Sequence, residues 1–145
     1  MGHEPIFSWD EELGFASCIL TDGENTYYGH AQCCPEDDEF RSEKTGCQIA
    51  LHRACISMYK HYRDILKIKL SALNQYYYSI VQSKQFDSES YEVRMLLRQI
   101  SMIKTDLATA KKMIADEKQS LKEYLSLKAE LHTKIRRNRS KAKIQ

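Results

Sequence analysis

The sequence contains little glycine and proline: five glycines and two prolines among 145 residues. Pro5 and Pro35 both lie in the first quarter of the chain, and after Gly46 neither residue type occurs through Gln145. Glycine and proline are the residues that most often end a helix. The long stretch without them therefore predicts long helices.

The sequence also lacks an apolar run near the ~20 residues that a bilayer-spanning helix needs. Its first twelve residues show no basic flank followed by an apolar core, the pattern of a secretory signal. The five cysteines lie between Cys18 and Cys55, and an odd number without a signal favours free thiols in a reducing compartment. We therefore expect a cytoplasmic protein with no membrane partner.

Charge and motifs exclude several function classes. The 22 basic and 20 acidic residues give a net charge of +2, so no whole-molecule field attracts nucleic acid. The sequence contains no GxxxxGK[ST], GxGxxG, HExxH or GxSxG motif, and long helices provide little enclosed space for a reaction. These observations predict a binding protein that is not an enzyme and carries no cofactor.

The N-terminal part predicts a β-hairpin. Residues 13–21 and 26–34 are the expected strands, and Asp22 and Gly23 between them favour a tight turn. Residues 1–12 are expected to form a loose or edge segment. Because an isolated hairpin is only marginally stable in water, it should pack on a helix or on a partner chain.

The first helix is expected from about residue 45 to about residue 83, after an acidic run at residues 36–39. Ser42 or Thr45 is the expected N-cap. A polar segment, residues 84–90, is the expected bend, and Ser88 or Ser90 should cap the next helix. The apolar positions of the first helix mostly recur at spacings of three and four, which predicts one buried face: Ile49, Ile56, Tyr59, Leu66, Leu70, Leu73, Tyr77 and Ile80.

The second helix carries the strongest pattern, a 4-3-4-3 heptad that only Glu117 and Lys128 interrupt. Such a repeat predicts a coiled-coil seam. The seam comprises Leu96, Ile100, Ile103, Leu107, Ala110, Ile114, Glu117, Leu121, Tyr124, Lys128, Leu131 and Ile135.

Together these elements predict an α+β, mostly α fold: an N-terminal β-hairpin packed on a long antiparallel two-helix coiled-coil hairpin. Residues 1–44 hold the hairpin and acidic turn and residues 45–145 the helical hairpin, as one structural unit. Two helices seldom bury both of their apolar stripes completely, so we expect a homo-oligomer.

The cysteines and histidines near the hairpin could serve two roles. Zinc needs three or four converging ligands, whereas small thiols on one helix face pack well beneath a sheet. Packing is the favoured interpretation, and no base is fixed beside any one thiol to make it a nucleophile. Whether zinc binds stays open for His30, Cys33, Cys34, Cys47, His52 and Cys55.

Two further clusters are candidate binding sites. Arg94 and Arg98, one helical turn apart on the second helix, can hold a phosphate or carboxylate, as can Arg53 and Arg63 on the first. Nearby aromatic rings can stack on a base: Tyr76, Tyr77, Tyr78, Phe86 and Tyr91. Alternatively, Tyr77 packs in the seam and the arginines pair with Glu89 and Glu92.

The basic tail is the second cluster. Its cations can contact nucleic acid or a partner, but cations are also favoured at any helix C-terminus, where a frayed end would be solvated. The residues concerned are Arg136, Arg137, Arg139 and Lys141.

The segment YGHAQCCPEDDEF at residues 28–40, followed by Gly46, Ala50 and the Arg53-Ala54 pair, resembles small phage and prophage proteins. Among these, the chain is similar to the Thoeris anti-defence family, whose members sequester a cyclic ADP-ribose signal, and to small anti-CRISPR proteins, which block an effector by binding it. The shared residues imply close packing of helix on strand, with Phe40 filling the corner.

The resemblance implies a non-enzymatic, phage-encoded inhibitor of a bacterial antiviral defence system, located in the host cytoplasm. Its partner would be a host defence protein or its nucleotide signal. A direct block is slightly favoured, because the sequence does not gather basic and aromatic residues into one pocket. The alternatives are a nucleic-acid-binding accessory protein that uses the basic tail, and a plain coiled-coil scaffold.

Overall fold

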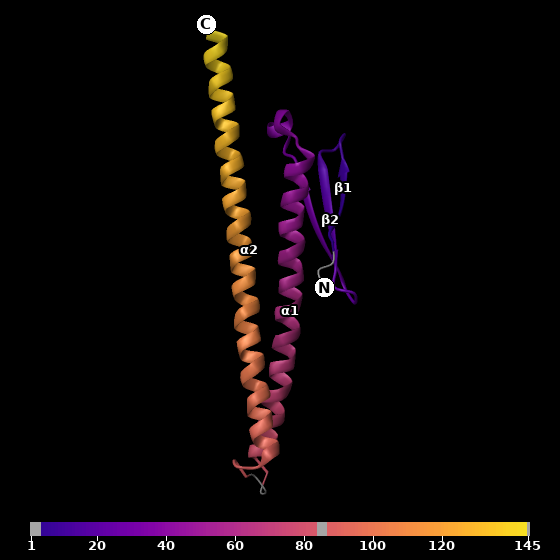
Figure 1. The fold of residues 1–145 in the computed structure, drawn as a ribbon, viewed down its shortest axis with the longest axis vertical. Helices are drawn as coiled ribbons and strands as arrows, with labels where there is room; N and C mark the ends of the chain where they lie inside the picture. Colours follow the sequence, from indigo (N-terminus) through magenta and orange to yellow (C-terminus); the bar gives the residue numbers. More distant parts are fainter. Residues whose placement is uncertain (1–3, 84–86, 145) are drawn as a thin grey trace. The chain divides into compact units, whose positions relative to one another are not determined.

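The computed structural model describes residues 4–83 and 87–144 and is an α+β, mostly helical protein (Figure 1). The chain forms two compact units: Met1–Met58 with Ala115–Gln145, and Tyr59–Ile114. Both helices continue from one unit into the other. The elements, in chain order, are β1 (Ile6–Asp10), β2 (Phe15–Thr21), β3 (Thr26–Gln32), the 3₁₀ helix η1 (Pro35–Phe40), α1 (Glu43–Val81) and α2 (Tyr91–Ile144).

The predicted hairpin is a three-stranded antiparallel sheet with β2 in the centre. The expected pair of strands is present, but β1 adds a third, with Ile6 opposite Ile19 and Asp10 opposite Phe15. Gly14 permits the extra reversal because its φ of +61° is unfavourable for residues with a side chain. This strand is the edge form of the loose or edge segment predicted for residues 1–12, and its apolar side chains stay exposed, 63% for Ile6 and 42% for Phe7.

The predicted turn at Asp22 and Gly23 is a four-residue loop, since Thr21 and Thr26 form the last strand pair. The Asp22 carboxylate accepts hydrogen bonds from the backbone N–H groups of Glu24 and Asn25, at 2.9 and 2.8 Å. Gly23 has a φ of +96°. The side chain of Asp22 therefore holds a loop longer than the tight turn that the dipeptide predicts.

In the first unit, the sheet packs on the N-terminal part of α1 (Figure 1). The inward side chains of β2 and β3 alternate with outward ones, and Ala16 and Cys18 are fully buried. Gly29 lies against the backbone of Ala50 and Ala54. The close approach of strand to helix that the sequence predicts is therefore confirmed.

Helix α1 begins at Glu43 because Ser42, not Thr45, is its N-cap. The Ser42 hydroxyl accepts a hydrogen bond from the backbone N–H of Thr45 at 3.3 Å, and the Ser42 carbonyl accepts from Gly46 at 2.9 Å. The helix ends at Val81. All eight predicted apolar positions of this helix are buried or half-buried.

Helix α2 begins after Ser90, whose hydroxyl accepts from the backbone N–H of Val93 at 3.3 Å; Ser90, not Ser88, is therefore the N-cap. In the second unit the chain reverses between the helices, and the Tyr76 hydroxyl donates to Glu92 at 2.9 Å. The two helices therefore run antiparallel there. The predicted stripe is buried in this unit at Leu96, Ile100, Leu107, Ala110 and Ile114.

In the first unit the α2 stripe departs from the heptad at one position. Leu131 was expected in the seam but is 48% exposed, and His132 is the half-buried residue instead. His132 faces inward because its ring stacks on the Phe40 ring of η1, whereas Ile135, the next position of the repeat, is again half-buried. Coiled-coil packing, the division at residues 44 and 45, and self-association all stay predictions. No helix within residues 4–83 and 87–144 is long and apolar enough to cross a membrane.

Candidate functional site

The first unit contains a cavity of about 390 Å³ whose walls come from four places in the sequence. The end of β3 and η1 form one side, and α1 and α2 form two others. Trp9 and Gly14 contribute from the region of β1. The lining residues on the two helices are Ser42, Thr45, Gly46, Ile49 and Arg53 of α1 and its cap, and Leu125, Lys128, Ala129, His132, Thr133 and Arg136 of α2.

The cavity lining is basic. Arg41, Arg53, Lys128 and Arg136 contribute four permanent cations, and His132 adds an imidazole. None of the described lining residues is an aspartate or glutamate. A concave site lined by charge of one sign concentrates ions of the opposite sign. The lining therefore favours an anionic ligand.

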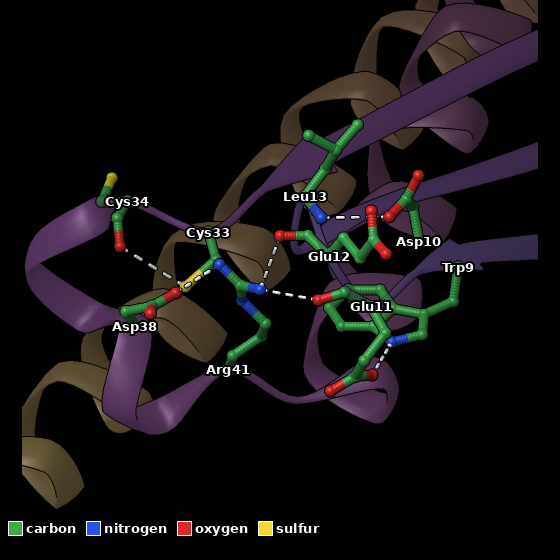
Figure 2. A network of polar contacts seen from close by, with 9 residues as sticks. All are labelled: Trp9, Asp10, Glu11, Glu12, Leu13, Cys33, Cys34, Asp38 and Arg41. Carbon is green, nitrogen blue, oxygen red and sulfur yellow. Dashed lines mark hydrogen bonds and ion pairs between the residues drawn. The ribbon is translucent and has the colours of Figure 1, made fainter.

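Arg41 builds the wall of the cavity through its own contacts (Figure 2). Its Nη1 donates to the backbone carbonyls of Glu11, at 2.6 Å, and Glu12, at 3.0 Å, and its Nη2 bonds to the carboxylate of Asp38. Its Nε is buried over Gly14 without a hydrogen-bond partner in the described part of the chain. Arg41 therefore joins the β1–β2 turn to η1.

The 3₁₀ helix is held to α2 by an aromatic and ionic cluster. The rings of Phe40 and His132 stack with centroids 4.1 Å apart and planes 5° apart. The Glu39 carboxylate accepts from Arg136 at 3.2 Å and Arg139 at 2.8 Å, and both guanidinium groups lie over the Phe40 ring. Phe40 thus fills the corner by contact with α2, and Glu39 balances charge beside the cavity.

Arg53 and Lys128 differ from Arg136 and Arg139 because their contacts are with uncharged groups. Arg53 Nη1 donates to the carbonyl oxygen of His30 at 2.6 Å, a neutral acceptor. The Lys128 ammonium lies 5.5 Å from the centroid of the Tyr124 ring. Neither residue forms an ion pair with a carboxylate in the described part of the chain. Their charges are therefore available to a ligand.

A second polar cluster joins α1 to α2 at His52. Its Nδ1 lies 2.5 Å from Glu117 Oε1, and its Nε2 lies 3.2 Å from the amide nitrogen of Gln48. Because that amide is a donor, Nε2 accepts and Nδ1 carries the proton donated to Glu117. Both ring nitrogens are therefore engaged, and His52 cannot also serve as a base for a neighbouring thiol.

Three thiols of the first unit, those of Cys18, Cys47 and Cys55, are poor nucleophiles and poor metal ligands in this setting. Burial, followed by repulsion from Glu117, raises the pKa of Cys55 from 9.0 to about 11. Burial also raises the pKa of Cys18 and of Cys47. Only a thiolate attacks carbon or binds zinc efficiently. Across residues 4–83 and 87–144, no group of three or more potential ligands converges on a metal position.

Except for Arg53, the tyrosines and arginines predicted as a ligand site lie in the second unit. Arg94 and Arg98 are exposed on α2, Tyr91 is 72% exposed, and Tyr78 is 67% exposed beside an open groove of α1. Phe86 lies outside the described residues. A shared role for Arg94, Arg98, Tyr78 and Tyr91 in ligand binding stays a prediction.

The basic tail is helical through Ile144. Two of its predicted contact residues, Arg136 and Arg139, bond to Glu39, and Arg136 also lines the cavity. Arg137 and Lys141 are exposed. The tail is therefore partly tied to η1, and its contact with nucleic acid or a partner stays a prediction.

The sequence predicts Arg53 as an anion-binding residue, but together with Arg94 and Arg98, which lie in the second unit. Sequence reasoning missed Arg41, Lys128 and His132, and among these a usable signal existed for Lys128, which interrupts the apolar stripe of α2. Comparisons of the chain with protein-family models, with curated proteins and with solved structures yield no match. The resemblance to phage anti-defence proteins therefore stays a prediction.

Proposed function

We propose that this chain is a non-enzymatic binding protein that sequesters a small anionic ligand in the cavity of its first unit. The observation that carries the proposal is the lining of a cavity of about 390 Å³, which contains four permanent cations, an imidazole and two aromatic rings. Two of the cations, Arg41 and Arg136, bond to carboxylates just outside the lining, and Arg53 and Lys128 have no carboxylate partner among the described residues. Ligand pockets typically measure roughly 300–1,000 Å³. The cavity is at the small end of that range, which suits one small molecule.

The groups around the cavity support binding over catalysis. A nucleophile needs an activated side chain beside a base. The lining thiols are those of Cys33 and Cys34, and the Cys33 thiol donates to the Cys34 carbonyl. The lining imidazole of His132 is stacked on the Phe40 ring. Cations held on rigid helices stabilise a bound anion without any chemical step.

The resemblance to anti-defence proteins gives such a cavity a biological use. A phage-encoded protein that removes a nucleotide signal inhibits a bacterial antiviral system by mass action, in the host cytoplasm. The sequence alone slightly favours a direct block of an effector protein, because it does not reveal a shared basic and aromatic pocket. The cavity lining brings basic and aromatic side chains together in one place, so we favour sequestration of a ligand over a direct block.

The nucleic-acid alternative receives less support from the contacts. Arg136 and Arg139 bond to Glu39 in this structure, so phosphate contacts by these two residues would compete with an existing ion pair. A scaffold function would need no basic cavity. A gel shift at low salt that is lost on mutating Arg137 and Lys141 would revive the nucleic-acid reading.

Retention of a ligand through purification tests the proposal. The protein would be produced in a bacterial host, purified without phosphate buffer, denatured, and the released small molecules identified by mass spectrometry. We expect an anionic compound at near-stoichiometric amounts, reduced in an Arg53→Ala/Lys128→Gln double variant and retained in Lys134→Ala. The absence of any retained anion, together with no rise in melting temperature across a panel of nucleotides and organic acids, would contradict it.

A further inference from the structure

We infer that Arg53 and Lys128 form a phosphate subsite, and that the cavity takes a small monophosphate ester that also carries a flat aromatic ring. This inference rests on the proposed function and deepens it by naming the charged group of the ligand and the two residues that hold it. It concerns the first unit alone, because both residues and the whole lining belong to that unit.

Two of the four cations in the cavity lining already have a carboxylate partner. Arg41 bonds to Asp38 and to two backbone carbonyls, and Arg136 bonds to Glu39. A ligand that used either would have to displace an existing ion pair. Arg53 and Lys128 face the cavity without such a partner among the described residues. An anion can therefore bind to Arg53 and Lys128 without breaking an existing ion pair.

Arg53 and Lys128 reach the cavity from different helices. Arg53 lies on α1 and Lys128 on α2, so the cavity receives one cation from each helix. Arg53 is held in place because its Nη1 donates to the His30 carbonyl, which leaves its other N–H groups for a ligand. A guanidinium fork and a compact ammonium together match the several oxygens of a phosphate.

The cavity lining also contains apolar side chains that can contact the uncharged part of a ligand. Trp9, Ile49 and Leu125 supply apolar surface in the same cavity, whereas the Phe40 ring is covered by His132 and by two guanidinium groups. A flat ring therefore has apolar surface to contact near Trp9. A cavity of about 390 Å³ is small for an extended chain. These features favour a small phosphate ester that carries an aromatic ring over an acidic peptide.

The protein carries its own reporter, because Trp9 lines the cavity and is the only tryptophan. Its fluorescence would be titrated with AMP, with adenosine and with inorganic phosphate, in phosphate-free buffer, and calorimetry would confirm the affinities. We expect saturable binding of AMP. Adenosine should bind at least about tenfold more weakly, because it lacks the phosphate that makes the charge-assisted contacts.

Variants assign the effect to the two residues. Lys128→Gln should weaken AMP at least about tenfold and leave adenosine binding unchanged, and Arg53→Ala should do the same. Lys134→Ala removes an equal charge from an exposed position of α2 outside the lining and should bind AMP like the unmodified protein. Because Arg53 also holds β3 through His30, its variant would be checked by circular dichroism; Lys128→Gln keeps the test decisive if that variant unfolds.

The other outcomes separate the inference from the proposed function. If adenosine binds as tightly as AMP, or if Lys128→Gln binds AMP normally, the phosphate subsite is wrong and the cavity remains a ligand site. If citrate binds but AMP and phosphate do not, the ligand class is wrong while sequestration stands. If no probe binds and the purified protein retains no anion, both fail.

Discussion

A Cβ atom on Gly29 would lie 1.9 Å from the backbone oxygen of Ala50, far inside van der Waals contact. The backbone of β3 therefore touches the backbone of α1 directly, and no flexible side chain separates them. Gly46 is also crowded, but its neighbours are side chains: Trp9 at 2.9 Å and Ala16 at 3.1 Å from a built Cβ. The two glycines thus limit the fold in different ways.

Gly29→Ala is expected to destabilise the first unit by at least about 3 kcal/mol, because backbone atoms of α1 must move to admit the methyl group. Gly46→Ala is the matched comparison. There the Trp9 ring can shift, and alanine gains up to about 1 kcal/mol of helix propensity over glycine. Urea unfolding followed by circular dichroism measures both variants. Equal losses of stability at the two positions would contradict the direct backbone contact.

Ser90→Ala is expected to reduce the stability of the second unit by about 1 kcal/mol, because the hydroxyl that accepts from the backbone N–H of Val93 is lost. Ser88→Ala is the control, since the sequence offered both serines as caps and the structure uses Ser90. Thermal unfolding monitored at 222 nm compares the pair. A larger loss for the Ser88 variant would show that α2 begins earlier than Tyr91.

The helices could be predicted from the sequence because their signals are local and repeated. The heptad positions from Leu96 to Ile114 are buried or half-buried, and the two helices begin within two residues of the expected positions. The exchange of Leu131 for His132 could not be read from the repeat, because it depends on the stack that His132 makes with Phe40. Residues 1–12 were predicted to be a loose or edge segment, and they contain the edge strand β1. The sequence could not decide between the two alternatives, because Ile6 and Phe7 are exposed and give no inward alternation.

The cavity could not be predicted because its walls are distant in sequence. Arg53 and Lys128 are separated by more than half of the chain, and only the fold brings them to one lining. One signal was nevertheless present in the stripe of α2. It has two interruptions: Glu117 contacts His52, and Lys128 lines the cavity. Polar residues inside a strict apolar repeat are therefore worth testing as sites in their own right.

The raised pKa of Cys55 predicts a loss of stability in alkali. A thiol whose pKa is 9.0 when unfolded and about 11 when folded stabilises the fold fully below pH 9. That contribution is lost as the pH rises from 9 to 11, because the unfolded chain releases the proton more readily. Chemical unfolding at several pH values should show this fall in the unmodified protein and a smaller one in Cys55→Ala.

Cys18, Cys47 and Tyr76 also have raised pKa values, so some alkaline loss persists in that variant and only the difference between the two proteins is diagnostic. A thiol reagent gives a second measurement. Cys34 is exposed, whereas Cys18 is buried, so labelling of the native protein should begin at Cys34 and reach Cys18 only on unfolding. Identical alkaline profiles for the unmodified protein and Cys55→Ala would contradict the burial of this thiol.

The contact between His52 and Glu117 predicts a strongly non-additive pair of mutations. Both side chains are shielded, with exposures of 14% and 23%, and their atoms are 2.5 Å apart. Glu117→Leu removes one of the two interruptions of the apolar stripe but leaves the His52 N–H without its acceptor, which should cost about 1–3 kcal/mol. His52→Leu leaves the carboxylate without its donor and should cost a similar amount.

The double variant His52→Leu/Glu117→Leu removes both polar groups and places two apolar side chains in contact. Its stability should return to within about 1 kcal/mol of the unmodified protein or exceed it, because replacing a shielded polar pair by apolar residues is often neutral or stabilising. A double-mutant cycle from urea unfolding gives the coupling energy. Simple addition of the two single losses would mean that His52 and Glu117 do not contact each other in solution, and that Glu117 interrupts the stripe for another reason.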